Sequence, residues 1–169
     1  MPRFTLSSEI TVDRLRPDKD TVFTFVATAD DCHMLAKRFG FLAVNALSAR
    51  LKVFKSARHC WEISGQMTGD VVQACGVTGA PVSETIDFPL EERYVRQSRA
   101  YDEVEVALDG AEPLENGIID LGEMLAQSLA VAVTPWPRAD DAPESFKSGD
   151  IMPDHPFAGL AVLKGKSSK

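Results

Sequence analysis

Residues 41–53 read Phe-Leu-Ala-Val-Asn-Ala-Leu-Ser-Ala-Arg-Leu-Lys-Val, and this stretch decides the fold class. Its residues fall into two alternating sets. One parity holds Ala43, Asn45, Leu47, Ala49, Leu51 and Val53, and the other holds Val44, Ala46, Ser48, Arg50 and Lys52. A period of two is typical of a β-strand with one buried face. The sequence therefore predicts a long strand whose outer face is polar.

Stretches on both sides of this strand have a similar pattern. Residues 21–28 are rich in β-branched and aromatic side chains, while 61–65, 70–75 and 84–94 continue downstream as further strand candidates. Turn-forming residues near 56–58 and 78–81 separate them. Consecutive strands joined by short turns indicate antiparallel pairing. The predicted fold is an antiparallel, β-rich α+β domain, with its sheet either a meander or partly closed like a barrel.

Two main helices are predicted. The first runs to Phe39, with Asp30 or Asp31 as its N-cap and Gly40 closing it. The second starts after Asp120 and ends before the Pro135-Trp136-Pro137 triplet, because proline cannot continue the hydrogen-bond ladder. Residues 3–15 are expected to be extended, and the acidic stretch 99–117 is expected to be a loop.

The chain has 169 residues, about the length of one domain. We predict a single α+β domain over 1–137, a polar and mobile segment over 138–154, and a C-terminal docking segment with a basic tail over 155–169. The chain has neither a long apolar run nor the apolar region of a secretory signal. Its three cysteines lack Cys-x-x-Cys spacing and are expected to be reduced thiols. These features predict a cytoplasmic protein without membrane partners.

Charge is unevenly distributed along the chain. The net charge of −7 argues against a uniformly basic nucleic-acid binder. Between Met34 and Trp61, however, there is no acidic residue, and four aromatic residues interleave with six basic ones: Lys37, Arg38, Arg50, Lys52, Lys55 and Arg58. Such a run can contact RNA phosphates and stack on bases. The alternative is that a strand's outer face simply carries solvated Lys and Arg.

The following section is strongly acidic. Between Pro81 and Asp150 there are 16 acidic and 5 basic residues, a local charge of −11. We select five of the acidic residues as candidates for binding a basic protein: Glu91, Glu92, Asp102, Glu103 and Glu105. The alternative is that they only keep the protein soluble.

The sequence supports neither a metal site, a cofactor nor an active site. The adjacent pairs Cys32-His33 and His59-Cys60 lack ligand spacing, because neighbouring strand residues point to opposite faces. No nucleophile elbow, P-loop or dinucleotide fingerprint occurs. We therefore predict a non-enzymatic protein with no cofactor and no metal. A hydrolase with an unrecognised site would require a cleft with perturbed titratable groups.

Five blocks of the sequence, in this order, resemble the YceD family, the bacterial large ribosomal RNA subunit accumulation proteins. The blocks cover nearly the whole chain: 4–15, 35–40, 65–78, 119–123 and 156–164. The Lys-Arg-Phe-Gly and Cys-x-x-Thr details resemble its alphaproteobacterial branch. Thr78 stands where many family members have a second cysteine, so the resemblance does not extend to their zinc site. His155 stands where relatives commonly have Asn.

This resemblance implies a role in the accumulation or processing of 23S rRNA and in assembly of the large ribosomal subunit. It implies no catalytic residue. We expect a ribosome-biogenesis factor that meets 23S rRNA or its precursor directly or indirectly. The alternative is an acidic protein-binding module that holds a small basic ribosomal protein.

Overall fold

The computed structural model describes residues 5–17, 19–96 and 110–143. Its centre consists of three strands of 15 residues each, β3 (Ala43–Ala57), β4 (Cys60–Ala74) and β5 (Pro81–Val95). They pair antiparallel in chain order. The predicted α+β class with antiparallel pairing is confirmed.

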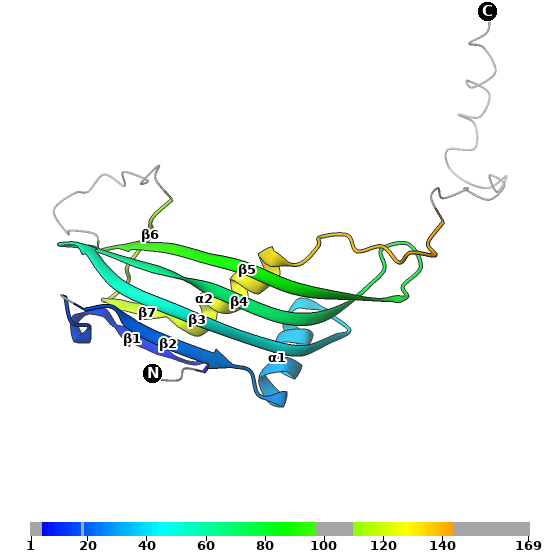
Figure 1. The fold of residues 1–169 in the computed structure, drawn as a ribbon, viewed down its shortest axis with the longest axis horizontal. Helices are drawn as coiled ribbons and strands as arrows, with labels where there is room; N and C mark the ends of the chain where they lie inside the picture. The colour runs from blue at the N-terminus through cyan, green and yellow to red at the C-terminus, as the bar shows by residue number, and fades with distance from the viewer. Residues whose placement is uncertain (1–4, 18, 97–109, 144–169) are drawn as a thin grey trace, which may run out of the picture.

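Two shorter strands complete the sheet. Strand β2 (Thr21–Val26) pairs antiparallel with β3, and the two-residue β6 (Glu112–Pro113) pairs parallel with the end of β5. The order is β2-β3-β4-β5-β6, and within the described residues the sheet is open, so it is not a barrel. Figure 1 shows it as a long twisted layer with both helices behind it. Strand β6 lies in the stretch that was predicted to be a loop.

The alternation predicted for β3 holds over residues 47–53. Leu47, Ala49, Leu51 and Val53 are buried, while Arg50 and Lys52 point outward. The parity predicted for the start of the strand is wrong, because Val44 is buried and Asn45 is exposed. A bulge between Val44 and Ala46 in the pairing with β4 explains this reversal. One extra residue in a strand moves the following side chains to the opposite face.

Helix α1 (Ala29–Phe39) has a different N-cap from the one predicted. Thr28, not Asp30 or Asp31, is the cap: its hydroxyl accepts a hydrogen bond from the Asp31 amide, and the Asp31 carboxylate accepts one from the Thr28 amide. Asp31 is thus the returning half of a capping box. Gly40 closes the helix with a φ of 72°, as predicted.

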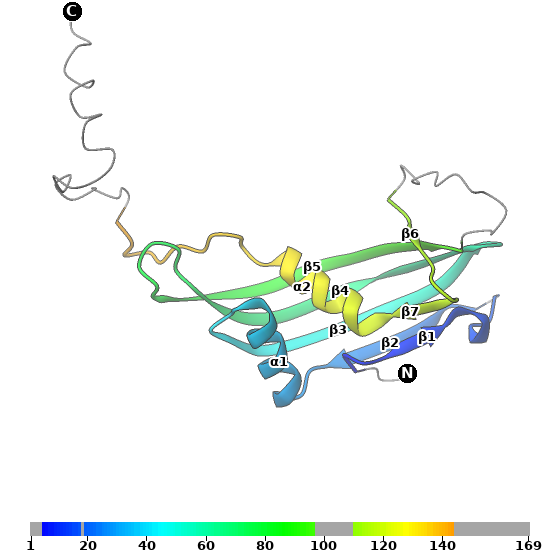
Figure 2. The same ribbon diagram turned by 180° about the vertical axis from the view of Figure 1, so that it is seen from behind.

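Helix α2 (Leu121–Ala132) begins at the predicted cap, where Asp120 accepts a hydrogen bond from the Glu123 amide. Its fully buried residues Leu121, Leu125 and Leu129 lie one turn apart and face the sheet core. Figure 2 shows α2 crossing the same side of the sheet as α1. Among the described residues no helix covers the opposite side, which we call the open face.

The N-terminal segment, predicted as extended throughout, contains a short strand and a 3-10 turn. Strand β1 (Glu9–Thr11) pairs with β7 (Ile118–Asp120), and the turn η1 (Val12–Arg14) follows it. The strand β7 was not predicted. It leads directly into α2, so this pair places the N-terminal segment beside the first turn of the helix, where the Leu121 amide donates to the Ser8 carbonyl.

The chain beyond α2 is described to Pro143. Pro137 and Ala139 contact the turn between β4 and β5, at Gly76 and Cys75. The remainder of the predicted polar segment 138–154 and the whole of 155–169 lie outside the described residues. No described helix is long and apolar enough to span a membrane.

Gly122 allows the closest approach between α2 and the N-terminal segment. A Cβ at this position would lie 2.0 Å from the carbonyl oxygen of Leu6, so the backbone would have to move. We expect Gly122→Ala to lower the free energy of unfolding by about 1–3 kcal/mol, as overpacking does. Gly76→Ala is the control, because the nearest atom there would be 3.9 Å away. Urea unfolding would compare them, and wild-type stability of Gly122→Ala would contradict the contact.

Candidate functional site

The six predicted RNA-binding residues lie in three separate places. Lys37 and Arg38 are in the last turn of α1, on the helix-covered side of the sheet. Two others, Arg50 and Lys52, lie on the open face of β3. The last two, Lys55 and Arg58, lie near the turn that joins β3 to β4. The six residues therefore do not form one continuous patch.

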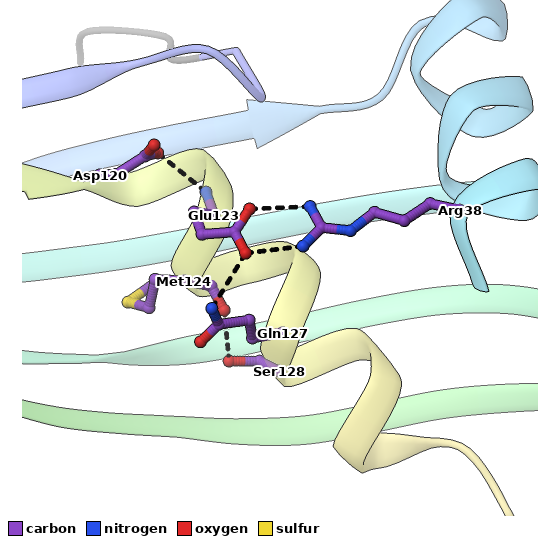
Figure 3. A network of polar contacts seen from close by, with 6 residues as sticks. All are labelled: Arg38, Asp120, Glu123, Met124, Gln127 and Ser128. Atoms are coloured by element: carbon purple, nitrogen blue, oxygen red, sulfur yellow. Dashed lines mark hydrogen bonds and ion pairs between the residues drawn. The ribbon is translucent and has the colours of Figure 1, made fainter.

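Arg38 connects the two helices. Its Nη1 and Nη2 atoms donate to the two carboxylate oxygens of Glu123 at 2.7 and 2.6 Å, a bidentate pair (Figure 3). Gln127 donates to the same carboxylate at 2.9 Å. The hydrogen bonds from Arg38 and Gln127 lower the pKa of Glu123 to about 2. Arg38 is thus used between helices and is less available to a phosphate.

Arg50 and Lys52 line one shallow hollow of about 370 Å³ on the open face. Val22 of β2, Leu51 of β3 and Ser64, Gly65 and Gln66 of β4 complete it. The Lys52 ammonium lies 4.8 Å from the centroid of the Phe54 ring and 3.5 Å from the Asp20 carboxylate. This ion pair is exposed and therefore weak, so a phosphate can compete with Asp20 for Lys52.

The aromatic residues of the basic run have mostly structural roles. Phe39 and Phe41 pack together with their ring centroids 5.7 Å apart, and Trp61 is 3% exposed. Lys55 and Arg96 lie over the Trp61 ring, at 5.6 and 5.2 Å from its centroid. Of the four aromatic residues, Phe54 alone lies next to the cations of the open face.

The predicted acidic set is only partly described. Glu91 and Glu92 are consecutive residues of β5, so they point to opposite faces of the sheet. Glu91 has the parity of the open face and is exposed, whereas Glu92 shares the parity of buried Leu90 and Tyr94. Asp102, Glu103 and Glu105 lie outside the described residues.

A pocket of about 310 Å³ lies between β5, β6 and α2, and we call it the β5–α2 pocket. Its acidic lining residues are Glu91, Glu92 and Glu112. Burial and then the nearby Glu112 raise the pKa of Glu92. Burial also raises the pKa of Tyr94, with further contributions from Glu112, Glu92 and Asp120. The sequence pattern predicted Glu92 as a binding residue but predicted neither the pocket nor Glu112. The signal for the pocket was a charged residue, Glu92, at an inward-facing position of a strand.

Cys75 lies in a cradle of hydrogen-bond donors at the turn after β4. Its sulfur accepts from the amides of Val77 and Thr78, both at 3.4 Å, and from the amide of Ala139 at 3.3 Å. The Ala139 amide has the largest effect, followed by Thr78, and together the donors lower the pKa of Cys75 to about 6. Thr78 therefore helps to stabilise a thiolate at Cys75.

The three cysteines are free thiols, as predicted. In the described ranges no group of three or more His, Cys, Asp or Glu side chains is arranged to hold a metal ion. No family model, curated protein or solved structure matches the chain. The candidate surfaces are therefore the cationic hollow on the open face and the acidic β5–α2 pocket.

The Cys75 cradle predicts a thiolate at neutral pH. In a titration followed by ultraviolet thiolate absorbance, we expect one group with a midpoint near pH 6. Cys75→Ser should remove this transition, and Cys32→Ser should leave it in place. Because the folded pKa lies below the ~8.5 of an unfolded thiol, this group stabilises the fold above that pH, and the contribution disappears as the pH falls through about 6. A midpoint in the ordinary thiol range would contradict the cradle.

Proposed function

We propose that this protein is a non-enzymatic cytoplasmic factor that supports 23S rRNA accumulation and large-subunit assembly, and that it contacts RNA directly through the open face. The resemblance of the five sequence blocks to the YceD family supports the process. The hollow between Arg50 and Lys52 supports the direct contact.

The placement of these two cations is the observation on which the RNA contact rests. Residues two apart on a strand point to the same side, about 7 Å apart along it. Arg50 and Lys52 thus present two donors along the rim of a hollow whose other side chains are small or uncharged. A guanidinium and an ammonium on such a surface can each bind one phosphate of a single strand.

The other predicted cations are less suited to this role. Arg38 is held by Glu123, and Lys55 lies over the buried Trp61. Lys37 is on the helix-covered side, and Arg58 is in the turn at one end of the sheet. The RNA contact that we propose is therefore narrower than the run of basic residues in the sequence.

Charge reversal on the open face tests the proposal. The double variant Arg50→Glu, Lys52→Glu should lose salt-sensitive binding to a 23S rRNA fragment. The slope of log affinity against log salt should decrease by about 1.4, which is ~0.7 for each lost phosphate contact with a single strand. Fluorescence anisotropy across a salt series measures both quantities.

The matched control is Lys37→Glu, Arg58→Glu, which changes the net charge equally but leaves the open face intact. It should bind RNA with nearly the wild-type slope. Equal losses in both variants would mean that only net charge matters, and no binding by the wild type at low salt would refute direct contact.

A second candidate function is the binding of a basic protein during assembly. The observation that favours it is the β5–α2 pocket, where the carboxylates of Glu92 and Glu112 lie beside apolar side chains. Changing Glu91, Glu92, Asp102, Glu103 and Glu105 together to Lys should abolish binding of individually purified basic large-subunit proteins and leave RNA binding intact or improved. If these reversals change nothing, the acidic section serves solubility.

A further inference from the structure

We propose that the hollow on the open face selects unpaired RNA bases with an amino group, cytosine and adenine. Gln66 accepts a hydrogen bond from that amino group, while Arg50 and Lys52 bind the neighbouring phosphates; all three residues line the hollow. This inference rests on the proposed RNA contact and names the class of nucleotide that the contact would select.

The orientation of the Gln66 side chain is set by its neighbour Asp87. The Nε2 atom of Gln66 donates a hydrogen bond to the Asp87 carboxylate. Because a carboxylate can only accept, the amide must turn its nitrogen toward Asp87, which leaves its carbonyl oxygen, Oε1, for another donor. No described residue donates to this oxygen. The structure therefore leaves one oriented acceptor beside the hollow.

The two cations lie directly across from this acceptor. In the pairing of β3 with β4, Arg50 is the partner of Gln66, and Lys52 is the partner of Ser64. Such partners project from the same face with their Cβ atoms about 5 Å apart. The Arg50 guanidinium makes neither a hydrogen bond nor an ion pair with any described residue, so it is available to a phosphate. A phosphate on Arg50 therefore leaves the base of an adjoining nucleotide within reach of Gln66.

The charges on the open face orient a bound strand. Arg50 and Lys52 lie on β3, whereas Asp87 and Glu91 lie on the same face of β5, beyond β4. On the other side Asp20, just before β2, pairs with Lys52. Phosphates are attracted to β3 and repelled by the carboxylates on both sides, so the sugar–phosphate backbone is confined to β3. The uncharged bases are not repelled and can extend over β4.

The free acceptor explains why the selected bases are those with an amino group. Cytosine and adenine carry an amino group where uracil and guanine carry a carbonyl oxygen. An amino group can donate to Oε1 of Gln66, whereas a carbonyl oxygen at the same place would bring two acceptors together. Such base edges are accessible in single strands and loops. Asp87 acts through Gln66 and is therefore a positioning residue.

The test compares short fluorescent oligocytidine and oligouridine, two pyrimidine strands of equal charge, by anisotropy with the full chain at neutral pH. The wild type should bind oligocytidine about two- to tenfold more tightly, as expected for one net hydrogen bond. Gln66→Met keeps a side chain of similar length at an exposed position but removes the carbonyl acceptor. Its two affinities should become equal, while the salt slope stays that of the wild type because the phosphate contacts remain.

Asp87→Lys is an independent variant for which the preference should shift toward oligouridine. An ammonium only donates, so it would attract the Gln66 carbonyl and turn the amide nitrogen toward the hollow, where uracil O4 can accept from it. Both strands carry the same charge, so their affinity ratio does not report the added cation. The matched control is Asp70→Lys, an equal charge change on β4 at a residue that accepts from Thr85 instead of Gln66. It should keep the wild-type ratio.

The outcomes separate base selection from the RNA contact on which it rests. If the wild type binds oligocytidine no more tightly than oligouridine, and Arg50→Glu, Lys52→Glu loses both, the RNA contact stands and base selection is wrong. A cytidine preference that survives either Gln66→Met or Asp87→Lys would also overturn base selection, since the base would then be read elsewhere. If the wild type binds neither strand at low salt, both proposals are wrong.

Discussion

The docking of α2 against the sheet is the interaction on which the rest of the structure depends. The inner face of the three long strands is apolar over most of its length. Exposing such a face to water is unfavourable, so a folded monomer must cover it. Leu121, Leu125 and Leu129 cover it with no remaining exposure. Asp120 fixes where the helix starts, and this start places Gly122 under the Leu6 carbonyl and aims Glu123 at Arg38.

The docking also gives the two faces of the sheet different roles. The covered face is filled by the core, and Glu92 and Glu112 line a pocket at its margin, between β5 and α2. On the open face, Arg50 and Lys52 lie on β3, and Glu91 is two strands away on β5. The cationic hollow and the acidic pocket therefore lie on opposite faces of the sheet.

Local sequence patterns predicted the features that depend on neighbouring residues, such as strand alternation and helix caps. The alternation of β3 and the cap of α2 followed from residue type and spacing, and both are present. The predicted N-cap of α1, Asp30 or Asp31, was wrong. Thr28 is the N-cap because it forms a capping box with Asp31, and this depends on both residues together. The bulge at Asn45 depends on pairing with β4, which no single strand reveals. Likewise, the pairing of Arg38 with Glu123 joins residues 85 apart in sequence, so the sequence pattern did not predict that Arg38 links the two helices.

The sequence blocks that resemble the YceD family and lie within the described residues include places where distant segments touch. Block 35–40 meets block 119–123 through Arg38 and Glu123, and block 4–15 meets it through Leu6 and Gly122. Block 65–78 ends in the Cys75 cradle, which holds the chain after α2. The charged residues of the two candidate surfaces, Arg50, Lys52, Glu92 and Glu112, lie outside the blocks, whereas Gly65 and Gln66 of the hollow lie in block 65–78. Because a close backbone approach or a bidentate ion pair tolerates few residue types, such positions restrict sequence more than a solvated surface does. The blocks therefore contain residues that hold distant segments together, and the charged residues of the two candidate surfaces lie between the blocks.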